Sequence, residues 1–180
     1  SISFHEKDPS LPNPAREFQK ARKQMKQISE AFPVLDYMMG NHCSLPQRKA
    51  RLIGLPDDVL VDFATLWDVQ DWTIHPRFAD FELNGVTYRH GDKGKGGLMA
   101  GYKNAIAEFQ SVAQGHLHAQ AGVVYHANQG DCVFGMQVGC GVDHDHPAMN
   151  YGRVYSAKPI VGCGVVFSPK RANFIPMDLS

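Results

Sequence analysis

The order of hydrophobic patterns along the chain limits the fold more than any other feature of the sequence. Apolar residues recur at spacings of three and four between residues 15 and 32, which predicts an amphipathic helix. Pro33 ends this pattern, and the mostly apolar run 34–39 before Gly40 predicts a buried strand of a parallel sheet. From residue 121 onward the patterns are almost all strand-like. Helices alternating with strands, followed mainly by strands, indicate an α/β sheet packed on a more antiparallel second sheet.

Shorter elements are expected in the middle of the chain. Residues 46–68 predict one or two helical pieces broken near Gly54 and Pro56. Two alternating runs flank Asn84-Gly85, and an Asn-Gly pair between such runs is a strong hairpin signal. The remaining expected elements are hairpin strands at 78–83 and 86–90, a glycine-rich stretch at 91–101, a helical segment ending near 109, and strands at 112–113, 121–126, 132–138 and 161–167.

Composition places the chain among ordinary globular proteins. Its 180 residues, 43% hydrophobic and 20% charged, predict one domain over residues 1–180. The 18 basic and 18 acidic side chains balance, so nucleic acid could be bound only by a local patch. The four cysteines form no C-x-x-C pair, and no apolar run reaches the length of about 18 residues that a membrane helix needs. We therefore expect a cytoplasmic protein that does not enter a membrane.

Histidines stand at the ends of several predicted strands. Four of the nine in the chain, His42, His90, His116 and His118, follow a predicted strand and have glycine beside or close to them. Ligands collect at strand ends in open α/β sheets, and glycine lets the backbone approach a ligand closely. Neutral imidazole binds zinc, manganese and iron well. Any one of these histidines alone is more often structural, so the indication lies in the ordered set.

That set resembles a known family. Gly40-Asn41-His42, then His90-Gly91, then Gly115-His116-Leu117-His118 resemble the last three motifs of the calcineurin-like metallophosphoesterases, which are G-N-H-[D/E], a lone H and G-H-x-H. The resemblance extends from about residue 10 to about residue 165, and the segment 138–151 resembles the closing segment of phage-type members. It implies an α/β/β/α sandwich of mixed sheets with flanking helices. It also implies a hydrolase acting on ester bonds, in the cytoplasm of the cell or of a phage host.

The resemblance assigns roles to particular residues. It implies that Asn41, His90 and His116 bind one metal ion, that His118 binds a second, and that His42 is the general acid. Two divalent ions of manganese, iron, zinc or nickel would activate a bridging water and clamp the phosphate. The expected substrate is a phosphodiester or phosphomonoester, with nucleic acid or a nucleotide suggested by the phage-type relatives.

Two motifs of the family, D-x-H and G-D-x-x-D, do not occur in this chain. In the family they supply most ligands of the first metal and the bridging aspartate, so one ion is an alternative to two. The fold is accordingly expected to lack its first strands. Three explanations stay open: the chain is a fragment of a longer product, a second polypeptide completes the site, or the site has lost its activity.

Further residues near the motifs carry separate expectations. Cys43 stands where the family has a carboxylate that orients the catalytic histidine, and Asp143 could supply that carboxylate from elsewhere. Asp143 also begins the run D-H-D-H, for which a polar turn is favoured over a metal site. Lys93 and Lys95 lie in the glycine-rich stretch after His90 and suit a substrate phosphate, although no P-loop motif is present.

These observations support more than one class of function. Metal-dependent phosphoester hydrolysis is the leading hypothesis. The alternative is a catalytically degenerate phosphoesterase fold that acts as a binding or structural module. A zinc-stabilised fold using His116, His118 and cysteine is weaker, because no cysteine is near these histidines in the sequence.

Overall fold

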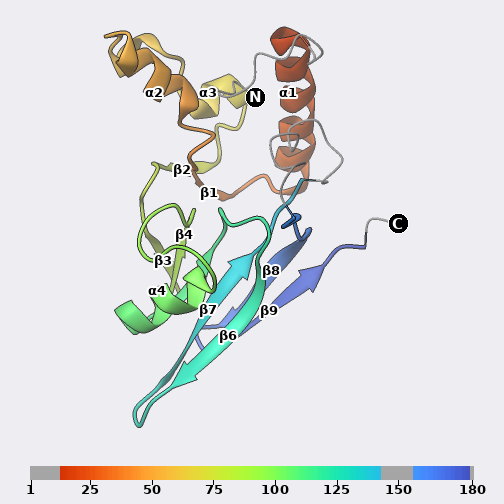
Figure 1. Ribbon diagram of the computed structural model, residues 1–180. Coiled ribbons are helices and arrows are strands. Elements are labelled where there is room, and N and C mark those ends of the chain that lie inside the picture. The colour runs from red at the N-terminus through yellow and green to blue at the C-terminus, as the bar shows by residue number, and fades with distance from the viewer. Residues whose placement is uncertain (1–12, 143–155, 179–180) are drawn as a thin grey trace. The chain divides into compact units, whose positions relative to one another are not determined.

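The computed structural model describes residues 13–142 and 156–178 (Figure 1). The chain divides into two compact units, Ser1–Arg77 and Phe78–Ser180. One domain over residues 1–180 stays a prediction. Within the described ranges, every helix is too short or too polar to cross a membrane.

The Ser1–Arg77 unit begins with a long helix and continues with short elements. Its elements are α1 (Pro14–Ala31), β1 (Asp36–Met38), α2 (Leu45–Leu52), the 3-10 helix η1 (Asp57–Val59), α3 (Phe63–Trp67) and β2 (Thr73–His75). The Asn13 side chain accepts a hydrogen bond of 2.8 Å from Ala15 N and so caps α1, and Pro33 cannot continue the helix. The predicted helix over 15–32 and the break near Gly54 and Pro56 are confirmed.

The strand predicted at 34–39 is present but shorter than expected. It pairs in parallel with β2, in the register Asp36↔Thr73 to Met38↔His75. Val34 lies outside β1 and is 81% exposed, so the expectation that this run is buried is wrong at its start. A sheet of two three-residue strands covers little surface. The unit relies instead on aromatic contacts, such as the Tyr37 and Phe63 rings stacked with centroids 4.7 Å apart.

The Phe78–Ser180 unit contains a five-stranded mixed sheet (Figure 1). Its elements are β3 (Phe81–Leu83), β4 (Val86–Arg89), α4 (Ala100–Glu108), β5 (Ser111–Gln114), β6 (Ala121–Ala127), β7 (Cys132–Val138), β8 (Gly162–Ser168) and β9 (Arg171–Pro176). The sheet order is β3-β4-β5-β7-β6, and the three central strands are parallel. Strands β8 and β9 form a separate antiparallel pair. The predicted helix ending near residue 109 and the strands predicted at 112–113, 121–126, 132–138 and 161–167 are confirmed. The strand predicted at 78–83 begins only at Phe81, and β9 was not predicted.

The predicted hairpin at Asn84-Gly85 is confirmed. Leu83 and Val86 are opposite each other across the antiparallel pair β3–β4, which leaves a two-residue turn. Both turn residues have positive φ, 50° at Asn84 and 73° at Gly85, as a type I′ turn requires. The turn thereby sets the register of β4, the strand that directly precedes His90.

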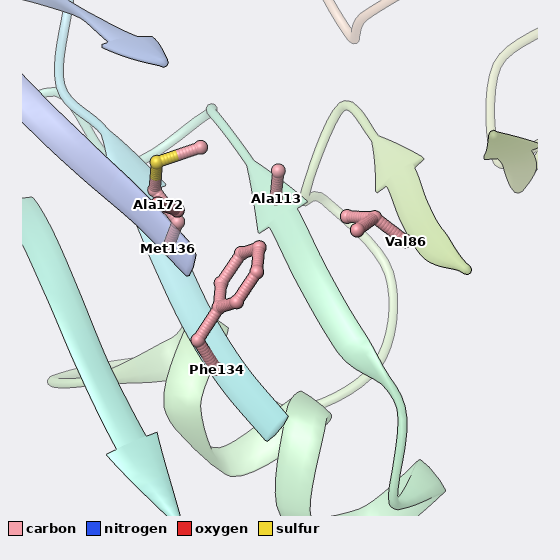
Figure 2. Close-up of a cluster of buried hydrophobic side chains, with 5 residues drawn as sticks. All are labelled: Val86, Ala113, Phe134, Met136 and Ala172. Carbon is pink, nitrogen blue, oxygen red and sulfur yellow. The ribbon is translucent and has the colours of Figure 1, made fainter. Parts of the chain in front are cut away.

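The five-stranded sheet is covered on both faces. Gly135 faces α4, because a Cβ at this position would collide with the backbone of Tyr102. Its neighbours Phe134 and Met136 therefore point to the opposite face. There they form a core cluster with Val86, Ala113 and Ala172 of β9 (Figure 2). The unit is thus a mixed α/β structure with α4 on one face of the sheet and the β8–β9 pair on the other.

Candidate functional site

Two of the predicted metal ligands lie side by side at one edge of this sheet. Strands β4 and β5 are parallel neighbours that end opposite each other, at Arg89 and Gln114. His90 directly follows β4, and His116 follows β5 by two residues. The two imidazole rings approach edge to face, with centroids 5.2 Å apart and planes at 67°. The strand ends therefore bring together two residues that the family resemblance implies as ligands of one metal ion.

The glycines beside these histidines let the two loops come close. Gly115 N donates a hydrogen bond of 3.0 Å to the carbonyl of His90. Gly91 has a φ of +105°, and a Cβ there would lie 2.8 Å from the carbonyl oxygen of Gly115. Any other residue at 91 would be strained in its backbone and would collide with the neighbouring loop. Glycine at position 91 is thus a local requirement of the histidine pair.

His116 itself has an unusual backbone conformation. Its φ is +69°, and Leu117 N donates a hydrogen bond of 2.9 Å to the carbonyl of Gly115. These features describe a γ-turn with a positive central φ, which is rare and strained for a residue with a side chain. Such strain persists only where surrounding contacts enforce it, and it is concentrated at functional sites.

His118 follows in the same turn, but it does not complete a metal cluster there. Its carbonyl accepts a hydrogen bond of 2.9 Å from Ile160 N, which ties the turn to the segment before β8. Across the part of the chain that the structure describes, no group of three or more His, Cys, Asp or Glu side chains is arranged to hold a metal ion. Zinc sites in proteins use three or four protein ligands. The His90 and His116 pair is therefore not a complete metal centre by itself.

Asn41 and His42 lie in the other unit, in the turn between β1 and α2. The turn is closed by hydrogen bonds from Ser44 N to the Gly40 carbonyl, 3.1 Å, and from Leu45 N to the His42 carbonyl, 3.1 Å. The His42 residue is exposed. The motif thus follows a strand end, as the sequence predicts. The metal-binding role of Asn41 and the acid role of His42 stay predictions.

Cys43 contacts a phenol. The Tyr37 hydroxyl lies 3.1 Å from the Cys43 Sγ. Burial raises the pKa of Tyr37, and the nearby Cys43 adds to this rise through its charge and its hydrogen bond. Asp143, the other residue predicted to support His42, lies outside the described residues, as does the rest of the D-H-D-H run.

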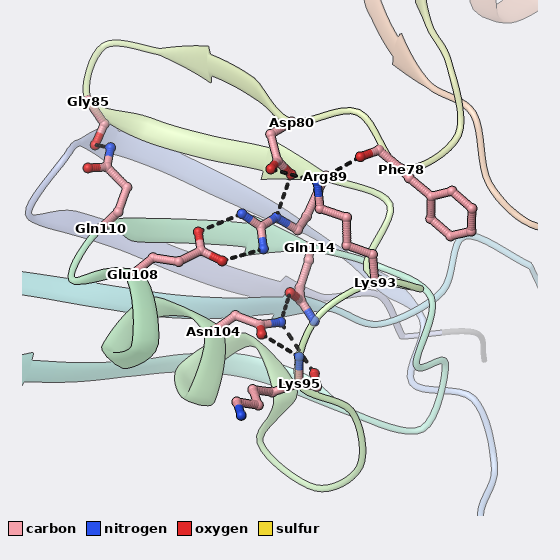
Figure 3. Close-up of polar contacts among 10 residues, drawn as sticks. All are labelled: Phe78, Asp80, Gly85, Arg89, Lys93, Lys95, Asn104, Glu108, Gln110 and Gln114. Carbon is pink, nitrogen blue, oxygen red and sulfur yellow. Dashed lines mark hydrogen bonds and ion pairs between the residues drawn. The ribbon is translucent and has the colours of Figure 1, made fainter.

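The two lysines predicted to bind phosphate have different surroundings. Lys93 Nζ lies 2.8 Å from an Asp80 oxygen and donates a hydrogen bond of 2.7 Å to the Phe78 carbonyl (Figure 3). A phosphate at Lys93 would compete with that carboxylate. Lys95 N donates a hydrogen bond of 2.7 Å to Asn104 Oδ1, so its backbone is held by α4. Substrate binding by either side chain stays a prediction.

A buried arginine next to His90 was not predicted. The Arg89 guanidinium, with 3% of its side chain exposed, donates hydrogen bonds of 2.7 and 2.6 Å to Glu108 and forms an ion pair of 2.9 Å with Asp80 (Figure 3). Burial acts to lower the pKa of Arg89, but the hydrogen bonds and charges of the two carboxylates outweigh it, and the pKa is raised. These contacts anchor the end of β4. In the sequence, the one indication of this arrangement was an arginine near the end of the predicted strand 86–90.

Three buried carboxamides were also missed. Asn104, Gln114 and Gln137 are 2%, 1% and 6% exposed, and they come from α4, β5 and β7. They connect to the backbone at Lys95 and Gly115 through hydrogen bonds. Gln114 and Gln137 stand at or near the ends of otherwise apolar strands, which is the one indication that the sequence offered.

Comparison of the sequence with models of known protein families finds no match, and comparison with curated proteins finds none either.

Proposed function

We propose that the chain is a metal-dependent phosphoester hydrolase of the metallophosphoesterase type, with His90 and His116 among its metal ligands. The observation that supports this proposal best is the imidazole pair at the ends of adjacent parallel strands, with ring centroids 5.2 Å apart. Imidazole is a common ligand of zinc, manganese and iron, and strand ends are where α/β sheets bind ligands. In this proposal the fold is the α/β/β/α sandwich of that family.

The pair needs further ligands to become a metal centre. His118 is the nearest candidate in the sequence, and Asn41 is the other neutral candidate. Carboxylates from a preceding segment or a second polypeptide would compensate the charge of the ions. When bound, divalent ions supply a Lewis acid for the phosphate and lower the pKa of a water molecule. His42 would protonate the leaving oxygen as general acid. The proposed substrate is a phosphodiester or phosphomonoester of a nucleotide or nucleic acid, in the cytoplasm.

A non-catalytic role is the second candidate. It is favoured by the lack of a three-ligand cluster among the residues that the structure describes. It is also favoured by Cys43, which stands at the position where a carboxylate would orient a catalytic His42. The Cys43 thiol instead contacts the Tyr37 hydroxyl. In this alternative the chain keeps the fold and binds a partner or ligand without hydrolysis.

Metal stoichiometry separates the two candidates. The protein is incubated with manganese, desalted and analysed by native mass spectrometry, next to a His90→Ala, His116→Ala double variant. His126→Ala is a matched control, because His126 lies in the same unit, opposite Val133 near the start of β7, at the other end of the sheet. One or two ions in the wild type and in the control, lost in the double variant, would support the proposal. Hydrolysis of bis(p-nitrophenyl) phosphate would then be assayed with the same three proteins.

Absence of bound metal in the wild type, or binding that the double variant keeps, would contradict the proposed centre. Metal binding that depends on His90 and His116 without hydrolysis would favour the non-catalytic role.

A further inference from the structure

We infer that the three buried carboxamides Asn104, Gln114 and Gln137 are positioning residues that hold the His116 ring against His90. Their relevance to metal binding rests on the proposed function, whereas their effect on ring geometry does not.

The three amides form one directed chain of hydrogen bonds. Asn104 Nδ2 donates to Gln114 Oε1 at 2.9 Å, and Gln114 Nε2 donates to Gln137 Oε1 at 3.2 Å. Gln137 Nε2 then donates to the backbone carbonyl of Gly115. Figure 3 shows the first part of this chain, where the Asn104 and Gln114 side chains meet beside the backbone of Lys95.

The chain joins the two loops that carry the histidines. At one end, Asn104 Oδ1 accepts a hydrogen bond of 2.7 Å from Lys95 N, and Asn104 Nδ2 donates to the Lys95 carbonyl at 3.3 Å. Gly94 leaves room for this contact, since a Cβ there would lie 2.8 Å from Asn104 Oδ1. At the other end, the chain reaches Gly115, directly before His116. The loop after β4 and the turn after β5 are therefore fastened to the same buried structure.

The turn at His116 requires such support. Its φ of +69° is strained, and the preceding peptide is held from three directions. Gly115 N donates to the His90 carbonyl, and the Gly115 carbonyl accepts from both Leu117 N and Gln137 Nε2. Without Gln137, the Gly115 carbonyl would lose the hydrogen bond that it accepts from this side chain, and the γ-turn would relax.

Packing alone does not explain three amides in this place. The other residues of β5 and β7 in the sheet interior are mostly apolar, and the cluster of Phe134, Met136 and Ala113 fills one face without polar groups. Burying a carboxamide is costly unless its hydrogen bonds are made. Here each amide is placed where it donates to the next, and the last donates to the backbone beside His116.

The test compares Gln137→Met with Gln110→Met. Gln110 is a matched control, because its Nε2 also donates to a backbone carbonyl, that of Gly85, at 3.0 Å, but at the hairpin turn before β4 (Figure 3). In metal-free protein, we expect Gln137→Met to remove the nuclear Overhauser effect between the His90 and His116 rings and to shift the His116 amide resonance. Gln110→Met should leave both unchanged. In manganese titrations, Gln137→Met should raise the dissociation constant about tenfold, as for other groups that orient metal ligands.

Each result bears on the inference. An unchanged ring contact and unchanged manganese affinity in Gln137→Met, with only a lower melting temperature, would overturn it, because a purely structural amide would behave in that way. If Gln137→Met does not fold, Gln137→Asn takes its place; it keeps the amide but is too short to reach Gly115, and the same loss of ring contact is expected. A wild type that binds no manganese would overturn the proposed function alone, since the ring contact is measured without metal.

Discussion

The two units of the molecule bury apolar residues to different extents. Among the described residues, the Phe78–Ser180 unit has a cluster from β4, β5, β7 and β9 that is nearly closed to solvent, with Phe134 and Val86 at 0% exposure. The Ser1–Arg77 unit leaves large apolar side chains exposed, such as Leu52 at 76% and Ile53 at 75%. Both have helices and parallel strands. A broad sheet with two covered faces gathers its apolar side chains into one closed cluster, whereas two three-residue strands offer too little surface for a cluster of that kind.

The largest effect should come from opening the core of the Phe78–Ser180 unit. Phe134→Ala removes a fully buried ring, and we expect the free energy of unfolding of this unit to fall by about 3–5 kcal/mol. Phe167→Ala is the control, because Phe167 is 58% exposed in the same unit and should cost far less. Urea unfolding is followed by circular dichroism and by tryptophan fluorescence. Both tryptophans, Trp67 and Trp72, lie in the Ser1–Arg77 unit. If the urea midpoint of the fluorescence transition shifts in Phe134→Ala as much as that of the dichroism transition, the two units unfold together, and the contrast between them does not hold for stability.

Replacing a glycine of positive φ with alanine should lower the free energy of unfolding more at Gly91, in the Phe78–Ser180 unit, than at Gly54, in the Ser1–Arg77 unit. Gly91→Ala adds a Cβ 2.8 Å from the Gly115 carbonyl, so we expect about 2–4 kcal/mol of destabilisation, from the strained φ and the collision together. Gly54→Ala meets no atom within 4 Å, so only the backbone strain of about 1–2 kcal/mol remains. Urea titrations of the two variants check this. Equal losses would mean that the loops at the histidine pair can move apart freely.

The stability lost when the carboxylate of an arginine–carboxylate ion pair is removed should also depend on how deeply the pair is buried. Glu108→Gln weakens both hydrogen bonds to the buried Arg89, and we expect a loss of about 1.5–3 kcal/mol. Asp57→Asn weakens the exposed pair with Arg51 in the other unit, where water and salt replace the interaction, and little measurable change is expected. Chemical denaturation at low and high salt compares them. A salt-sensitive loss in Glu108→Gln would indicate that Arg89 is reached by solvent.

The smallest predicted effect is a loss of stability at alkaline pH, and this loss should be larger in the Ser1–Arg77 unit. Burial raises the pKa of Tyr37, and of Tyr88 in the other unit, above the unfolded value of about 10. The folded protein then holds its phenol protons more tightly, so this contribution to stability is full below about pH 10 and declines as the pH rises above it. Tyr37→Phe should flatten this decline more than Tyr88→Phe. Unfolding free energies at pH 8 and pH 11 test it, and equal slopes in all three proteins would contradict it.

Much of the local structure could be predicted from the sequence. The hairpin at Asn84-Gly85 follows from two residues that accept positive φ, and α1 ends before Pro33 because proline cannot continue it. The sequence also indicated that His90 and His116 each follow a short strand and have glycine beside them. The set of four metal ligands, the role of His42 and phosphate binding by Lys93 and Lys95 stay predictions.

Other features depended on contacts between residues far apart in the sequence. Lys93 was interpreted as a phosphate ligand, yet its ammonium lies beside Asp80, thirteen residues earlier. Arg89 and Glu108 form their pair across the connection between β4 and α4. The residues of neither pair are separated by a spacing typical of a helix or a strand, so no pattern along the chain could have revealed the pair.

The sequence by itself determined where the helices, the hairpin and most strands form, because these depend on neighbouring residues through backbone preferences and apolar spacing. Only the tertiary structure decided which strand ends meet, which charged groups pair, and that Asn104, Gln114 and Gln137 join into one hydrogen-bonded chain that ends beside His116. These outcomes depend on distances of a few ångströms between segments that the sheet brings together. A buried amide or guanidinium is stable only where its partners are in place, and the order of residues along the chain does not specify that place.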